Sequence, residues 1–422
     1  MKQTIRLRFL SIILFLALSL AVGIGIWPAQ IFASAPTYKI GILQPFTGPY
    51  ALYGKAVHDA CKIAADEMNI AGGIKGRRIE LLTRDTKAKV DVGVREAQDL
   101  ILRGGVDAII GVTSSGVNLG VIEVTKEYKV IHISTIANTE KASLERIHPY
   151  YFQTVPNSYI DTTSTARFAM KMPIKNFITI AADYEWGHSS VEIFTGHMSK
   201  ERPEVQWAKK FWPKLGEVDY TSYVTAILAE KPDICFAWFA GADFMNFVKQ
   251  AKGYGFFEKV RFVGPAFEDD LMDLGAEFPE GMLIYSRGAF YGIDTPQMKT
   301  FQQKYLTATG RYPSCWAILS YDAFTCLMES IKRAGSFDKD AIAKNLEGGK
   351  FKTLRGELNF RPIDHMMNSP MYFSTSFFDK AKGFCIGKDV TVVPGENCMR
   401  SPEEIKKIRA EKGIVFKPWH EK

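Results

Sequence analysis

The sequence predicts an α/β protein built from two doubly wound lobes in tandem. Three observations support this fold class. Short apolar runs alternate with segments of helical periodicity, the alternation restarts near residue 152, and the run Val106–Gly111 is apolar throughout. Strand–helix–strand order favours parallel sheets in right-handed βαβ units. An unbroken apolar run is typical of a strand that is covered on both faces.

Four strands are expected in the first half of the chain, at residues 38–43, 79–83, 106–111 and 130–133. Apolar residues recur at helical spacing from Val57 to Met68, and Gly72 and Gly73 end that helix. The next helix is expected from residue 94 to 102, before two further glycines. Each strand is therefore followed by a helix or a turn, as a doubly wound sheet requires.

The second half repeats the same plan without repeating the sequence. Strands are expected at residues 177–181, 205–211, 233–239, 260–263 and 282–285. Helices are expected after Gly187 and at residues 244–251, 301–305 and 321–333. From about Arg361 the pattern indicates a β-hairpin, with 371–378 as its best strand, and then a loose end.

Residues 1–33 have the pattern of a secretory signal peptide. A basic start is followed by an apolar run from Phe9 to Ile26 that contains no charge, and small residues follow at 33–35. We expect cleavage after Ala33 and a periplasmic mature protein. The run is long for a signal peptide, so an uncleaved membrane anchor is the alternative.

Composition excludes several classes of function. The 422 residues are 46% apolar and carry a net charge of +7, which is too mild to indicate nucleic-acid binding. No phosphate-binding loop and no HExxH motif occurs, and His188 and His197 are nine residues apart on an expected surface helix. We therefore expect no cofactor and no metal site, and a monomer.

The six cysteines leave their pairing open. Export permits disulfides. Cys385 and Cys398 lie in a Gly-rich polar segment, where a bond and two free thiols are equally compatible with the sequence. Cys315 with Cys326 is a weaker candidate pair. The other two cysteines, Cys61 and Cys235, lie in apolar patterns and are expected to be buried.

Two loops are candidates for ligand binding. Residues 111–116, Gly-Val-Thr-Ser-Ser-Gly, join an expected strand to a helix, and residues 134–138 follow the next strand. Free N–H groups at a helix start favour an anion, and a serine hydroxyl adds a directed hydrogen bond. Simple N-capping by serine is the alternative. A nucleophile turn would need a histidine, and the nearest, His132, lies within an expected strand.

Several motifs together resemble the leucine/isoleucine/valine-binding protein family, the substrate-binding subunits of ABC importers. The motifs are KIGILQPFTGPYALYG at 39–54, NIAGGIKG at 69–76, Asp85-Thr86, IGVTSS at 110–115 and Gly264-Pro265. The resemblance covers about residues 38–380. It implies a type I periplasmic binding protein fold whose three hinge crossings fall near 154–156, 283–287 and 362–370.

The resemblance also implies the division of the chain. We expect a first lobe of residues 34–155 with 286–365 and a second lobe of residues 156–285 with 366–395. Residues 396–422 form a C-terminal extension that either covers an edge or is disordered. The lobes of this family close around a ligand by a hinge motion, and the closed form docks on a membrane permease.

The resemblance places ligand-binding residues at five positions, and two more residues are candidates where the family pattern is lost. Ser115 falls on the serine that holds the ligand carboxylate, and a backbone group of Ile136 is expected to contact the ligand. Asn138 replaces a threonine. Tyr53 and Trp186 are expected to be aromatic walls of the first and second lobe. The remaining two positions are Phe239 and Glu268.

The anchor for a ligand ammonium departs from the family pattern. An acidic residue is expected directly after Gly264-Pro265, but this position is Ala266. Either Glu268 or Asp243 takes the role, or the ligand carries no ammonium, because an unpaired buried ammonium binds poorly. Phe239, together with Phe46 and Phe267, would give such a ligand an apolar surround.

We therefore expect an exported solute-binding protein that performs no chemistry and delivers a small ligand to a permease. A branched-chain or other hydrophobic amino acid is the first ligand candidate, and an aromatic or aliphatic carboxylate or an amide is the second. A sensory ligand-binding receptor of the same fold is a rival function. A secreted hydrolase that uses Ser114 or Ser115 is another.

Overall fold

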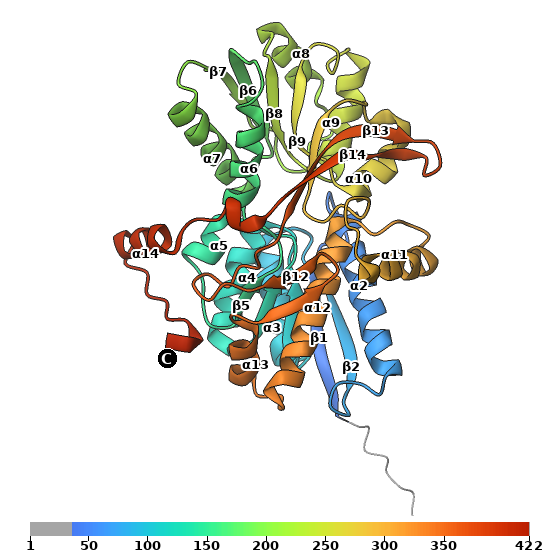
Figure 1. The fold of residues 1–422 in the computed structure, drawn as a ribbon, viewed down its shortest axis with the longest axis vertical. Helices are drawn as coiled ribbons and strands as arrows, with labels where there is room; N and C mark the ends of the chain where they lie inside the picture. Colours follow the sequence, from blue (N-terminus) through green and yellow to red (C-terminus); the bar gives the residue numbers. More distant parts are fainter. Residues whose placement is uncertain (1–35, 422) are drawn as a thin grey trace, which may run out of the picture. The chain divides into compact units, whose positions relative to one another are not determined.

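The computed structural model describes residues 36–421, and the expected signal peptide lies outside them. Two sheets, each covered by helices, form two lobes (Figure 1). The first sheet has the order β2-β1-β3-β4-β5, and all its pairs are parallel. Its strands are β1 (Thr37–Gln44), β2 (Arg78–Asp85), β3 (Ala108–Gly111), β4 (Ile131–Ser134) and β5 (Tyr151–Gln153).

The second sheet has the order β14-β13-β10-β9-β8-β6-β7. Its parallel part consists of β6 (Asn176–Ala181), β7 (Gln206–Phe211), β8 (Ile234–Trp238), β9 (Arg261–Pro265) and β10 (Leu283–Ser286). The hairpin of β13 (Met371–Asp379) and β14 (Phe384–Val393) adds to it in antiparallel register. The predicted fold class, two doubly wound lobes, is confirmed.

Helices cover both sheets. The first lobe carries α2 (Ala51–Ile70), α3 (Val90–Leu102), α4 (Ser115–Tyr128), α5 (Glu140–Leu144), α11 (Pro296–Thr309), α12 (Cys315–Ala334) and α13 (Lys339–Leu346). The second carries α6 (Ser158–Ala169), α7 (Glu185–Glu201), α8 (Thr221–Glu230), α9 (Ala242–Gly253) and α10 (Glu268–Leu274). A small hairpin, β11 (Lys350–Thr353) with β12 (Gly356–Asn359), and α14 (Pro402–Glu411) complete the fold, with single 3₁₀ turns at 275–277, 395–397 and 419–421.

The chain passes between the lobes after β5, after β10 and before β13. At the second passage, Ser286 ends β10 and Arg287 follows, fully enclosed by protein. At the first, the Thr154 hydroxyl donates a hydrogen bond to the Leu319 carbonyl of α12 at 3.2 Å. The cleft between the lobes is therefore bordered by the hinge segments themselves.

The two lobes begin with the same close contact. A Cβ on Gly54, in the first turn of α2, would lie 2.0 Å from the carbonyl oxygen of Pro45, directly after β1. A Cβ on Gly187, in the first turn of α7, would lie 2.1 Å from the carbonyl oxygen of Ala182, directly after β6. Only glycine permits this approach, and it sets each helix start against the carboxyl end of its strand.

The expected β-hairpin is present as β13 and β14, but the residues after it are not a loose end. β14 is a ten-residue strand, and a capping box at Ser401 and Glu404 starts α14. All six cysteines are free and buried in the described residues, so Cys385 and Cys398 are not bonded. The Cys385 thiol instead donates to the Phe278 carbonyl at 3.3 Å. No helix among residues 36–421 is both long and apolar enough to span a bilayer.

Candidate ligand-binding site between the lobes

A narrow cavity of about 20 Å³ lies where the two lobes meet. The carboxyl ends of the first-lobe strands, the starts of α2, α4 and α7, and the segment after β10 contribute to it. This is the position at which doubly wound sheets bind ligands. The residues that line the cavity are Tyr50, Tyr53, Thr113, Ser115, Ile136, Asn138, Tyr184, Trp186, Ala240, Phe267, Arg287 and Trp316.

The anion-binding side of the cavity is the start of α4. Ser115 is the first residue of the helix and is buried. Ser114 occupies the N-cap position, but its side chain makes no capping hydrogen bond. The alternative that this serine simply caps the helix is therefore not supported. Thr113 is held in place by a hydrogen bond from its hydroxyl to Gln44 Oε1 at 2.5 Å. The first N–H groups of α4 are thus left without a capping side chain, as an anion site requires.

The loop after β4 supplies the neighbouring wall. Ala137 N donates to the Val112 carbonyl at 2.8 Å, which ties this loop to the one before α4 and places Ile136 at the cavity. The Asn138 amide donates to Asp161 Oδ2 at 2.6 Å and to the Pro156 carbonyl at 3.1 Å. Asn138 therefore holds the first hinge crossing as well as lining the cavity.

Arg287 brings a buried positive charge to the cavity. It is 2% exposed and pairs with Asp161, which is fully buried at the start of α6. Burial raises the pKa of Asp161 to about 6, against the opposing effect of the guanidinium. Burial also disfavours the charged arginine, but Asp161 and Tyr285 keep the pKa of Arg287 above its usual value. The Nε atom of Arg287 has no hydrogen-bond partner among the described residues.

Aromatic rings form most of the remaining wall. The guanidinium carbon of Arg287 lies 5.2 Å from the ring centroids of Phe267 and Trp316 and 5.8 Å from that of Trp186. Trp316, the second residue of α12, lies 5.1 Å from Tyr53 between ring centroids. The indole N–H groups of Trp186 and Trp316 are buried without an acceptor in the described part of the chain.

The lobes are in contact in front of the cavity. The Tyr50 hydroxyl lies 3.0 Å from that of Tyr184, and the Tyr53 hydroxyl bonds to the carboxylate of Asp270 across the cleft. Gly241 N donates to the Tyr53 hydroxyl at 2.7 Å. Burial raises the pKa of Asp270 to about 8. The structure is therefore a closed form of the two lobes.

Five of the seven residues singled out from the sequence meet at this cavity, namely Tyr53, Ser115, Ile136, Asn138 and Trp186. Phe239 and Glu268 do not line it. Phe239 packs on the other side of β8, with its ring centroid 4.9 Å from that of Phe247. Glu268 begins α10 and accepts a hydrogen bond from Cys315 N at 2.9 Å, so its carboxylate serves the start of α12.

Asp243, the alternative anchor for a ligand ammonium, does not line the cavity either. Asp243 is buried at the start of α9, where it accepts a hydrogen bond from Gly216 N at 3.1 Å. None of the residues that line the cavity is acidic. The site thus combines hydrogen-bond donors, one guanidinium and aromatic surface.

Sequence reasoning missed Arg287, Trp316, Tyr50 and Tyr184 as site residues. Arg287 appeared only as the end of a hinge crossing, although a charged residue two positions after the apolar strand 282–285 was a usable signal. Trp316 is far from the other wall residues in sequence, and no local pattern brings it to them.

The geometry does not support a hydrolase. The ring Nε2 of His132 lies 3.3 Å from the Gly111 carbonyl oxygen rather than against a serine. Burial lowers the pKa of His132 to about 4, which is unsuited to a base that works near neutrality. No group of side chains among residues 36–421 is arranged to hold a metal ion.

Comparison with known proteins agrees with this architecture. A 371-residue match at 25% identity relates the chain to Leu/Ile/Val-binding protein homolog 4 of Brucella abortus (strain 2308), covering 84% of this chain and 86% of the relative. The leucine-, isoleucine-, valine-, threonine- and alanine-binding protein of Pseudomonas aeruginosa is 23% identical, over 78% of this chain and 86% of its own.

Solved structures show the same fold. A solute-binding protein of an ABC transporter from Rhodopseudomonas palustris BisB5, in complex with 3,4-dihydroxybenzoic acid, superposes with a TM-score of 0.78 at 22% identity, covering 87% of this chain and 99% of its own. A leucine-binding protein from Thermotoga maritima gives 0.73 at 20% identity, with coverages of 86% and 100%. A sequence model described as periplasmic binding protein matches residues 37–381, and the chain therefore belongs to the periplasmic binding protein family.

Proposed function

We propose that this chain is the exported solute-binding protein of an ABC importer, and that its ligand is a small aromatic carboxylate without an ammonium group. The lobes, residues 34–155 with 286–365 and 156–285 with 366–395, close on the ligand in the periplasm. The closed form delivers it to a membrane permease. The protein acts as a monomer and catalyses no reaction.

The observation that carries the ligand class is that no carboxylate lines the cavity, whereas several of its lining groups are hydrogen-bond donors. Ser115 and the start of α4, the guanidinium of Arg287 and two indole N–H groups all offer hydrogens, and no acidic side chain lines the site. Buried donors need acceptors. A carboxylate supplies them, whereas a buried ammonium would face donors and a cation.

The aromatic wall favours a ring on the ligand. Trp186, Phe267 and Trp316 surround the guanidinium and leave little room beside it, which suits a flat and compact molecule. The complexes of structural relatives with 3,4-dihydroxybenzoic acid and benzoate support the same class.

A branched-chain amino acid is the second candidate, because the sequence relatives are named for leucine, isoleucine and valine. Matched pairs of compounds separate the two. We would measure thermal shifts of the mature chain with 3-phenylpropanoate against phenylalanine, with 4-methylpentanoate against leucine, and with benzoate and 4-hydroxybenzoate.

We expect stabilisation by the acid of each pair that the cavity accommodates and none by the amine-bearing partner. Saturation at about 100 times the dissociation constant adds roughly 2.7 kcal/mol to the free energy of unfolding. Stabilisation by leucine but not by 4-methylpentanoate would overturn the proposed ligand class and leave the transport function intact. Absence of any shift across these acids and amino acids would count against a carboxylate importer altogether.

A further inference from the structure

The C-terminal segment lies beyond the part of the chain that matches the family, which ends at residue 381. It leaves β14 on the second lobe and ends against the first lobe (Figure 1). The chain thus makes a passage between the lobes, at residues 394–402, in addition to the three hinge crossings. Contacts fix this passage at both ends and in the middle.

At the second lobe, α6 holds the start of the passage. The guanidinium of Arg167 donates to the Asn397 carbonyl at 2.7 Å and lies 3.3 Å from the Cys398 sulfur. Gly395 packs so tightly on the third hinge crossing that a Cβ there would lie 2.4 Å from the Ser369 carbonyl oxygen. The beginning of the segment is therefore tied to the second lobe and to the hinge.

At the first lobe, α14 is anchored by Arg409. This side chain is 6% exposed and donates to the carbonyls of Leu144 at 2.9 Å, Ser143 at 2.8 Å and Ile363 at 2.7 Å. Three carbonyls that accept from one guanidinium fix its position closely.

The last residues of the tail add a second anchor on the first lobe. Trp419 Nε1 donates to the Pro149 carbonyl at 3.0 Å, and Trp419 N donates to Glu347 Oε2 at 2.8 Å. Glu347 is held from the other side by His365 Nε2, at 2.8 Å. The end of the segment is thus bound to the first lobe over two separate patches.

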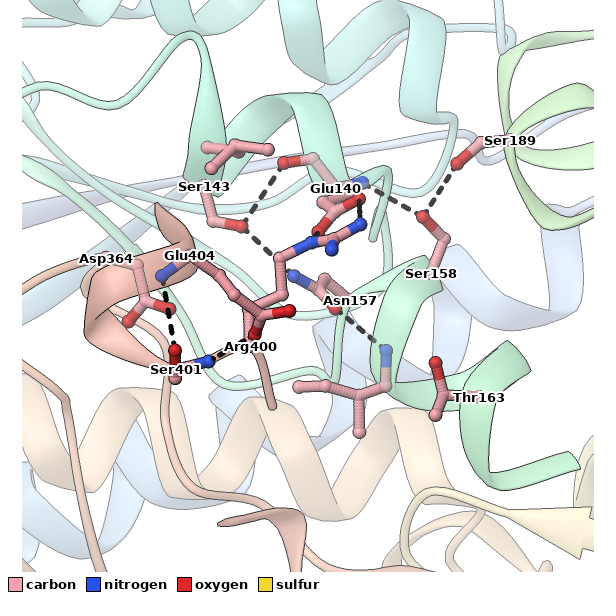
Figure 2. A network of polar contacts seen from close by, with 12 residues as sticks. Glu140, Ser143, Asn157, Ser158, Thr163, Ser189, Asp364, Arg400, Ser401 and Glu404 are labelled. Atoms are coloured by element: carbon pink, nitrogen blue, oxygen red, sulfur yellow. Dashed lines mark hydrogen bonds and ion pairs between the residues drawn. The ribbon is translucent and has the colours of Figure 1, made fainter. Parts of the chain in front are cut away.

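Arg400 lies at the midpoint and touches both lobes at once. Its Nη2 lies 3.2 Å from the carboxylate of Glu140 in α5 of the first lobe. Its guanidinium carbon lies 3.7 Å from the ring centroid of Tyr159 in α6 of the second lobe. Its own carbonyl accepts from Arg361 at 3.0 Å. Figure 2 shows Arg400 reaching Glu140 beside Ser158 and Asn157, at the first hinge crossing.

We propose that residues 394–402 act as a fourth interlobe strap, fastened by Arg400, that favours the closed arrangement of the lobes. An opening motion that separates α5 from the start of α6 would prevent Arg400 from keeping both Glu140 and Tyr159. The contact free energy at Arg400 is therefore available only when the lobes are closed, which shifts the equilibrium between open and closed forms. The inference does not depend on the identity of the ligand.

The test measures lobe opening without any ligand. Exposed Lys89, beyond β2, and exposed Lys214, beyond β7, are replaced by cysteine and spin-labelled, because the six native thiols are buried. Distance distributions are compared for the parent, for Arg400→Gln and for a chain that ends at Met399. We expect the closed population to fall at least about fivefold relative to the open one in both variants.

Lys412→Gln is the matched control. Lys412 is also a tail cation paired with a carboxylate, Glu145, but both members lie on the first-lobe side and the lysine is half exposed. We expect no change in its distance distribution, since exposed pairs contribute little. Unchanged distributions in Arg400→Gln overturn the strap, whether or not the truncated chain folds. Equal opening in Lys412→Gln and Arg400→Gln also overturns it, because general loosening of the tail would then be the cause.

Discussion

Ser115 and Arg287 show how differently two site residues are determined. Ser115 follows from local order, because a buried strand, a turn of small residues and a helix place it at the carboxyl edge of the sheet. Arg287 depends on burial beside Asp161, which is 126 positions away in the sequence. The sequence therefore predicts the position of Ser115 at the cavity, whereas the pairing of Arg287 with Asp161 depends on tertiary packing.

Ser115→Ala should weaken ligand binding without changing stability. Loss of one hydrogen bond to a charged group costs about 1.5–3 kcal/mol, so we expect the dissociation constant of the best acid to rise roughly 10- to 100-fold. Isothermal titration measures this, with Ser114→Ala as the control, since Ser114 is adjacent but does not line the cavity. Equal losses in both variants would contradict a specific role for Ser115.

Asp270 should make binding depend on pH. Its pKa is raised to about 8 by burial in the closed form, whereas a hydrated aspartate titrates at about 3.9. A carboxyl with a higher pKa in the closed form takes up a proton on closure. The closed form is therefore favoured at low pH and loses this advantage as the pH rises towards 8.

We expect ligand affinity to fall between about pH 5 and 8, by at most about tenfold per pH unit. Asp270→Asn retains the shape and removes this one titration, so its affinity should depend less steeply on pH than that of the parent. A parent protein whose affinity varies no more steeply than that of Asp270→Asn would show that closure does not protonate Asp270.

Helix α7 contains two glycines with opposite roles. Gly187 is at the close contact with the Ala182 carbonyl, whereas a Cβ on Gly196 would meet nothing within 4 Å. Alanine at 196 should stabilise the protein by about 0.5–1 kcal/mol through helix propensity. Alanine at 187 must displace backbone and should cost about 1–3 kcal/mol or more. Urea denaturation compares them, and similar effects at both positions would refute this account.

The helices and strands differ in how well their own sequence predicts them. Parallel strands with unbroken apolar runs, such as 108–111, are predicted well because both faces are buried. The β-hairpin was predicted, but its second strand, Phe384–Val393, was not located in the sequence, because its second half is largely exposed and lacks an apolar run. Helix α14 was missed because its mean hydropathy is low and its buried residues are only one isoleucine and one arginine, Ile405 and Arg409.

At the scale of the whole molecule, the lobes and the cleft follow from the repeated strand–helix plan, but their closure does not. Closure rests on contacts such as Tyr50 with Tyr184, which pair residues from separate lobes at positions that no sequence period relates. The placement of Glu268 illustrates the same limit. It lies three residues after Pro265 and is a candidate for a ligand contact on the sequence, yet its carboxylate accepts a hydrogen bond from the start of α12.

The six cysteines lead to a prediction for the intact protein. Burial raises the pKa of Cys235 and of the other thiols, which suppresses the reactive thiolate. We expect no labelling of the native chain by a maleimide over the time in which urea-unfolded chain reacts at all six positions. Rapid labelling of one thiol in the native protein, detected by mass spectrometry, would show a local opening at that site.

These unpaired thiols imply that folding is independent of the cellular oxidation machinery. A chain with no bond to form can reach its native state equally well in a reducing or an oxidising compartment, and its melting temperature should be the same with and without a reductant. Because each thiol is buried, the folded protein also has no accessible thiol that could form a mixed disulfide with a neighbouring protein. The thiols are therefore inaccessible to reagents in the folded protein and accessible only in chains that have failed to fold.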